Sequence, residues 1–145
     1  SSRYLTQRAL SLLHDAALTA CDTTDAVRDS IIGNPAACHF DPAALQCGCA
    51  SAPGTCLTAG QVQAAKRIYA GAIDPTDGRL LYPGLSPGSE PFWGAFATPG
   101  RPFPIPVSYY TWLVFGDSTW DWRTFDLSKP SDHRAYLESE ARLTP

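Results

Sequence analysis

Charged residues and long apolar runs are both scarce in this sequence of 145 residues. Charged side chains make up 17% of it, against roughly 25% in an average domain, and only two of them are lysines. A formal net charge of −3 without any basic cluster excludes a nucleic-acid-binding surface. No apolar run approaches the ~18 residues of a membrane-spanning helix. Because methionine is absent and no signal segment opens the chain, we expect a processed or excised piece.

The length and the apolar fraction of 44% fit a single domain, residues 1–145, of the α+β class, small and rich in helices and loops. Apolar spacing predicts a helix over the first 20 residues, followed by an irregular stretch as far as Thr55. Thr58 and Gln61 form a capping box that begins a second helix. The other expected elements are a hairpin of residues 72–73 and 79–82, a proline-rich surface loop at 83–106, a buried apolar segment at 107–115 whose composition favours a strand, and a last helix from Ser131.

All five cysteines lie between Cys21 and Cys56, and their spacing lacks the paired C-x-x-C of a zinc site. We therefore expect a disulfide framework formed in an oxidising compartment, either outside the cell or in a periplasm. Four cysteines can pair and one is left over. Cys47 and Cys49 compete for one partner because both lie near Cys56, so the spacing alone leaves the pairing open.

Three aspartates, Asp22, Asp25 and Asp29, converge in a short stretch with only Arg28 nearby to balance their charge. Asp is a poor residue for a helix interior, so an irregular loop is expected. Such a loop can bind Ca²⁺, which takes six to eight oxygens from carboxylates and backbone carbonyls. The spacing differs from that of an EF-hand, and the alternative is a solvated acidic loop.

Two other features carry no chemistry. The sequence from Gly84 to Gly88 matches the nucleophile-elbow pattern G-x-S-x-G. The residue after Ser86 is Pro87, which has no N–H for an oxyanion hole, so a catalytic serine is rejected. His133 lies in a polar helix start and is expected at the surface.

Several blocks of the sequence resemble the tannase and feruloyl esterase family. The most specific is CDTTDAVRDSII at residues 21–32, which is similar to the family signature C-D-x-x-D-G-x-x-D-G-x-I. The block at residues 56–61 is also specific, and weaker matches lie at residues 34–47, 80–84, 87–90 and 120–126. The resemblance covers most of the chain from Cys21 to Asp126 and favours a helix for residues 107–115.

The resemblance implies a lid domain inserted into an α/β-hydrolase core, which would be the partner of this chain. The family hydrolyses esters of aromatic acids such as gallate, ferulate or terephthalate monoesters by Ser–His–Asp acyl transfer. The triad would lie outside this chain, so the chain alone should be inactive. Its isolated lid would expose the face that rests on the core, and we expect it to self-associate.

The resemblance also implies the residues that staple this lid. Asp22, Asp25 and Asp29 match the carboxylate ligands of the family's calcium ion, and Val27 and Ile31 match its carbonyl ligands. The family usually has glycine at the two positions held here by Ala26 and Ser30. If these positions need a positive φ, both residues strain the loop and weaken the site.

The implied disulfides are Cys21–Cys38 and Cys47–Cys56, with Cys49 as an extra thiol.

For the substrate, we expect an aromatic ester to be contacted by the lid through a set of three aromatic residues and one cation, namely Phe92, Trp93, Phe96 and Arg101. The alternative for each aromatic residue is that it packs the lid's own core. A rival from another functional class is a free-standing secreted binding module that calcium stabilises. The rival explains the cysteines, the aromatics and the acidic loop, but not the order of the family motifs.

Overall fold

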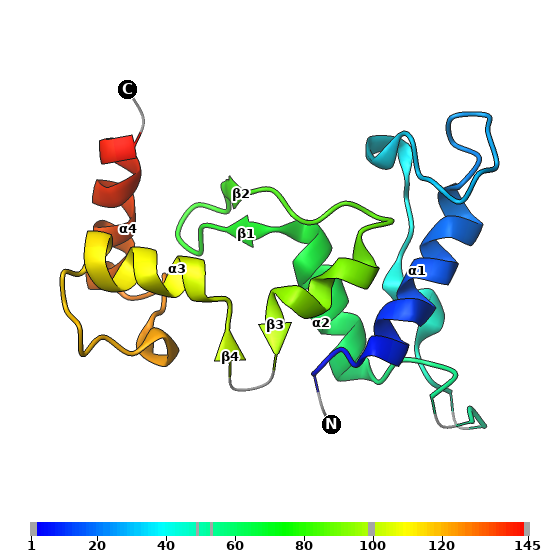
Figure 1. Cartoon of the computed structure of the whole chain (residues 1–145), viewed down its shortest axis with the longest axis horizontal. Coiled ribbons are helices and arrows are strands. Elements are labelled where there is room, and N and C mark those ends of the chain that lie inside the picture. The colour runs from blue at the N-terminus through cyan, green and yellow to red at the C-terminus, as the bar shows by residue number, and fades with distance from the viewer. Residues whose placement is uncertain (1–2, 49, 53, 99–100, 144–145) are drawn as a thin grey trace.

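The computed structural model describes residues 3–48, 50–52, 54–98 and 101–143. Helix α1 (Gln7–Cys21) lies at one end of the molecule's long axis, α3 (Pro104–Tyr109) and α4 (Pro130–Leu143) lie at the other end, and α2 (Ala59–Ala70) lies between them, next to α1 (Figure 1). We call residues 3–95 the body and residues 96–143 the aromatic part. No helix among the described residues is long and apolar enough to cross a membrane.

Both helices of the body begin after a capping threonine, of which only the second, Thr58, was predicted from the sequence. The Thr6 hydroxyl accepts a hydrogen bond from Ala9 N and caps α1. Thr58 and Gln61 form the expected capping box of α2. This helix ends at Gly71, whose φ of +83° is the left-handed conformation that glycine adopts without strain.

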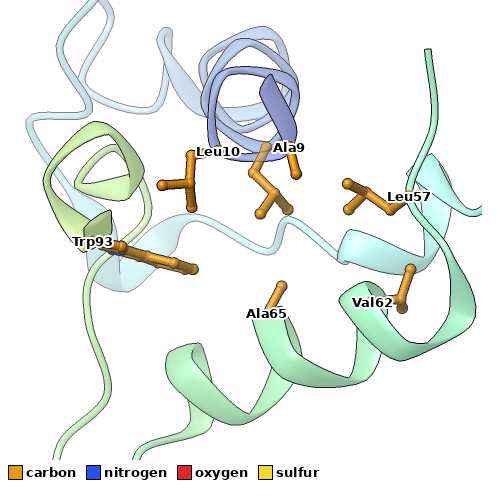
Figure 2. Packing of buried hydrophobic residues seen from close by; sticks show 7 residues of the cluster. Ala9, Leu10, Leu57, Val62, Ala65 and Trp93 are labelled. Atoms are coloured by element: carbon orange, nitrogen blue, oxygen red, sulfur yellow. The ribbon is translucent and has the colours of Figure 1, made fainter. Parts of the chain in front are cut away.

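The hydrophobic core lies between α1 and α2 and is closed on one side by the 3-10 helix η3 (Glu90–Ala95) (Figure 2). Leu10 and Leu13 of α1 meet Val62 and Ala65 of α2, and the Trp93 ring of η3 covers the edge of this contact. A second small cluster packs Ala17, Cys21 and Ile32 together. Every buried residue of both clusters belongs to the body, so the aromatic part is held by other means.

The irregular stretch after α1 is confirmed and contains two short 3-10 helices, η1 (Pro35–Ala37) and η2 (Pro42–Leu45). The hairpin is confirmed as well: β1 (Ala72–Ile73) pairs with β2 (Leu80–Tyr82) in antiparallel register. A second antiparallel pair, which was not predicted from the sequence, joins β3 (Ala97–Thr98) to β4 (Arg101–Pro102).

Two expectations for the proline-rich half were wrong. Residues 83–106 are not only a surface loop, because η3, with a buried glutamate and tryptophan, and the second hairpin lie within them. Residues 107–115 are not buried as expected, and they are helical, as the family resemblance favours, rather than the strand that their composition favours. They continue α3 into the π-helix η4 (Tyr110–Val114), in which Trp112 is 62% exposed. Proline at the first turn of α3 and η3 explains both helices, since its fixed φ favours that position.

Candidate functional site

Two disulfides staple the body and agree with the pairing that the family resemblance implies. Cys21 and Cys38 are bonded, with their Cα atoms 5.3 Å apart, and this bridge closes the acidic loop against the end of α1. Cys47 and Cys56 are bonded, with their Cα atoms 4.9 Å apart. The extra thiol expected at Cys49 lies outside the described residues.

The acidic loop repeats one local geometry. Asp25 Oδ1 accepts a hydrogen bond from Val27 N, and Asp29 Oδ1 accepts one from Ile31 N, each at 3.0 Å. The residue enclosed by each of these turns has a positive φ, +69° at Ala26 and +65° at Ser30. These are the two positions at which the family carries glycine, so the strain expected from the sequence is present in the loop.

One oxygen of the Asp22 side chain is the buried side-chain atom of the acidic loop that lacks a hydrogen-bond partner among the described residues. This side chain is half-buried, and Oδ1 has no hydrogen-bond partner in the described part of the chain. A buried carboxylate oxygen without a partner is costly, and a cation would satisfy it. However, no group of three or more His, Cys, Asp or Glu side chains among the described residues is arranged to hold a metal ion. The unpaired oxygen of Asp22 is compatible with a bound cation, but the side chains of the three aspartates are not close enough together to form a metal site by themselves.

A cleft of about 460 Å³ opens in the aromatic part. Arg101 is the only charged residue among the described residues that line it. The other lining residues are aromatic or aliphatic: Phe96, Pro102, Phe103, Pro106, Val107, Tyr110, Trp120, Trp122 and Phe125. Its size and apolar lining with one polar anchor are typical of a small-molecule site.

The structure divides the four residues expected to contact substrate. Phe96 and Arg101 both line the cleft, and the Phe96 ring packs edge-to-face on Phe103 at 5.2 Å. Trp93 instead packs the core: it is buried, it donates from Nε1 to Ser89 Oγ at 2.9 Å, and its ring meets Tyr69 edge-on. Phe92 is 72% exposed and lies outside the cleft lining.

The inner wall of the cleft was missed as a site, although its residues belong to segments that the sequence marks as aromatic. The rings of Tyr110, Trp120 and Phe125 contact one another, with centroids 4.8 to 6.2 Å apart. Burial raises the pKa of Tyr110 to about 12. The signal was present in Trp120–Trp122 and in the apolar run 107–115, but only the fold shows that these segments meet.

A buried glutamate links η3 to both helices of the body. Glu90 is fully buried; its Oε1 accepts hydrogen bonds from Tyr69 Oη at 2.6 Å and Gly88 N at 2.8 Å. Its Oε2 lies 3.0 Å from His14 Nδ1 on α1. Burial and the neighbouring carboxylate raise the pKa of Tyr69 well above its usual range, so this hydroxyl remains a donor.

A second buried carboxylate links the hairpin turn to α4. Asp74 is 2% exposed; its Oδ1 accepts hydrogen bonds from Thr76 N and Oγ1, and its Oδ2 lies 2.8 Å from His133 Nε2. The Thr76 hydroxyl, followed by His133, holds the pKa of Asp74 well below its usual range. The expectation that His133 is a surface residue was wrong, because the hairpin turn covers its ring.

The rejection of Ser86 as a nucleophile agrees with its surroundings. Its carbonyl accepts hydrogen bonds from Ser89 N and Ser89 Oγ, which makes it part of the turn that precedes η3. The strand-to-helix elbow that a nucleophilic serine needs does not occur here.

Comparison with known proteins places the chain in a family. The model of the tannase and feruloyl esterase family matches residues 1–100. The chain is 33% identical over 121 residues to "Probable feruloyl esterase B" of Emericella nidulans, covering 83% of this chain and 23% of that protein. It is 34% identical over 116 residues to "Probable feruloyl esterase B-2" of Aspergillus flavus, covering 80% of this chain and 22% of that protein.

Solved structures agree. The crystal structure of feruloyl esterase B from Aspergillus oryzae matches 95% of this chain and 28% of its own, with a TM-score of 0.83 and 27% identity. A crystal structure of an esterase from the same species matches 97% of this chain and 27% of its own, with a TM-score of 0.85 and 28% identity. The chain thus spans roughly a quarter of the length of these relatives. By sequence and by structure, it belongs to the tannase and feruloyl esterase family.

Proposed function

We propose that this chain is the lid of a secreted carboxylic-ester hydrolase and that its aromatic cleft receives the acyl ring of an aromatic ester. The observation that carries the proposal is the cleft itself, an apolar aromatic surface with a single arginine in its lining. The matches cover only 23% of the feruloyl esterase of Emericella nidulans and 28% of the crystal structure from Aspergillus oryzae, which supports a role for this chain as one part of a larger enzyme. The two disulfides support secretion, since such bonds persist in oxidising compartments.

In this role, the chain binds and orients the substrate rather than cleaving it. Tyr110, Trp120 and Phe125 present ring surfaces that can stack on an acyl ring, and their apolar walls exclude water from the covered ester. Arg101 at the cleft can pair with a carboxylate at the far end of a terephthalate-type monoester. The catalytic serine, histidine and aspartate would come from the rest of the enzyme, the hydrolase core on which the lid rests.

We further propose that the acidic loop binds Ca²⁺ through Asp22, Asp25 and Asp29, with the carbonyls of Val27 and Ile31. The orphaned oxygen of Asp22 supports this assignment. The bound ion would supply positive charge that fixes the loop, and it would take no part in ester cleavage. Because the Cys21–Cys38 bridge encloses the same loop, binding and bridging should reinforce each other.

The cleft assignment is tested by measuring, with NMR or calorimetry, how tightly this chain binds two ligands. Monomethyl terephthalate, which carries a free carboxylate, and the neutral methyl ferulate are the two probes. Arg101→Gln should weaken binding of the acid by about two- to fivefold, because exposed ion pairs contribute up to about 1 kcal/mol, and should leave methyl ferulate unchanged. Trp120→Ala should weaken both.

Arg67→Gln is the matched control and should leave the binding of both probes unchanged, since Arg67 is an exposed arginine of α2 and does not line the cleft. If Trp120→Ala bound each probe as tightly as the wild type does, the assignment of the cleft would be refuted.

A further inference from the structure

Asp74 and Glu90 are the only charged residues buried in the described part of the chain, and they share one arrangement. In each, one carboxylate oxygen accepts two hydrogen bonds, one from a nearby backbone N–H and one from a hydroxyl group. The other oxygen holds a histidine that is remote in sequence: His133 lies 59 residues from Asp74, and His14 lies 76 residues from Glu90.

The two pairs bracket the cleft along the chain. The cleft lining begins at Phe96, six residues after Glu90, and ends at Phe125, eight residues before His133. The hydrogen bonds of Glu90, together with the buried Trp93 ring, hold η3, the element before the cleft, against α1 and α2. His133 holds α4, the element after the cleft, against the turn of the β1–β2 hairpin, which lies between the two ends of the molecule (Figure 1).

The need for such ties follows from the packing. Both clusters of buried apolar residues lie in the body, and the rings of the aromatic part pack mainly on one another. Without a shared apolar core, the orientation of the aromatic part depends on a few directional contacts. A buried carboxylate is suited to this task, because losing its partner leaves a desolvated charge, which makes the paired geometry strongly preferred.

We propose that Asp74 and Glu90 are positioning residues, each of which, through its histidine, anchors one end of the cleft-bearing segment to the stapled body. The mechanical part of this proposal stands on the contacts alone. Its consequence for ligand affinity rests on the proposed function of the cleft.

Hydrogen exchange of the whole chain, resolved by peptide, tests the anchor at α4. His133→Leu leaves the second oxygen of Asp74 buried without a partner. Exchange in α4 and in residues 104–125 should rise by about tenfold, whereas α1 and α2 should change by less than about twofold. Asp74→Asn, with His133 intact, should keep the protection of the wild type, because its amide oxygen still accepts from Thr76 and its NH₂ can donate to an unprotonated His133 Nε2.

The anchor at η3 has its own pair of variants. His14→Leu removes only the contact to Oε2 and is chosen over the loss of Glu90, which could unfold the body. His14→Leu should raise hydrogen exchange in η3 and around the cleft. Glu90→Gln should leave exchange in η3 unchanged, because its amide oxygen still accepts from Tyr69 Oη and Gly88 N. Lys66→Gln, which breaks the exposed ion pair with Asp41 at 3.0 Å, is the matched control and should change nothing.

Unchanged exchange of α4 in His133→Leu and of η3 in His14→Leu would overturn the proposal, because apolar contacts alone would then hold the cleft. If exchange rises as expected but the wild-type chain binds neither monomethyl terephthalate nor methyl ferulate, the anchors stand and the proposed function of the cleft fails. If the wild type binds, His133→Leu should weaken both probes alike, unlike Arg101→Gln.

Discussion

The two strained residues of the acidic loop give the sharpest test of the structure. Ala26 and Ser30 have φ values of +69° and +65°, a region that costs a residue with a Cβ about 1–2 kcal/mol. Glycine removes that cost, but it also raises the conformational entropy of the unfolded chain, which favours unfolding by about 0.4–1 kcal/mol at each position. The double variant Ala26→Gly/Ser30→Gly should therefore raise the free energy of unfolding by about 1–2 kcal/mol.

Urea and thermal unfolding in a calcium chelator measure this gain without any contribution from a bound ion. For a chain of this size, each kcal/mol moves the Tm by about 2–4 °C, so the expected rise is several degrees. Ser11→Gly and Ala64→Gly are matched controls, because both residues lie inside helices, where glycine should lower the free energy of unfolding by about 0.5–1 kcal/mol. If the loop variant were destabilised as much as these controls, the strain argument would be refuted.

Three further predictions follow from contacts in the body and the aromatic part. Replacing Cys21 and Cys38 by serine should lower the free energy of unfolding by about 3 kcal/mol, measured by urea denaturation, because a loop of about 15 residues is then no longer closed; an unchanged midpoint would contradict it. Calcium at about 100 times its Kd should stabilise the wild type by about 2.7 kcal/mol and Asp22→Asn by much less, and an equal Tm shift in both would exclude Asp22 as a ligand. The pKa of Asp74 is lowered in the folded state, so its contribution to the free energy of unfolding is complete above the ordinary carboxyl range and is lost as the pH falls below that range. The free energy of unfolding should therefore fall less between pH 6 and pH 2 in Asp74→Asn than in the wild type.

The sequence predicted those parts of the fold that local signals determine. The capping box at Thr58, the turn between the two strands of the first hairpin and the acidic loop all depend on residues close together in the chain. Their identity follows from backbone chemistry, and the structure agrees with it. The disulfide pairing could not be chosen from spacing and followed only from the family resemblance.

What could not be predicted depends on contacts between distant residues. His133 sits in a polar segment, and only the return of the hairpin turn over α4 buries its ring beside Asp74. Trp93 and Phe92 are adjacent in sequence, yet one closes the core and the other faces solvent. Residues 107–115 have strand-like composition, but the prolines before them begin a helix, and this choice aims Trp112 outward.

Because the apolar core is confined to the body, the residues that stabilise the fold differ from those that line the cleft. The family model matches the chain as far as residue 100, close to the point at which the core ends and the ring-lined cleft begins. Substitutions in the cleft lining therefore leave the buried apolar contacts of the body in place. Such a division lets the shape of the cleft vary while the packing of the body stays the same.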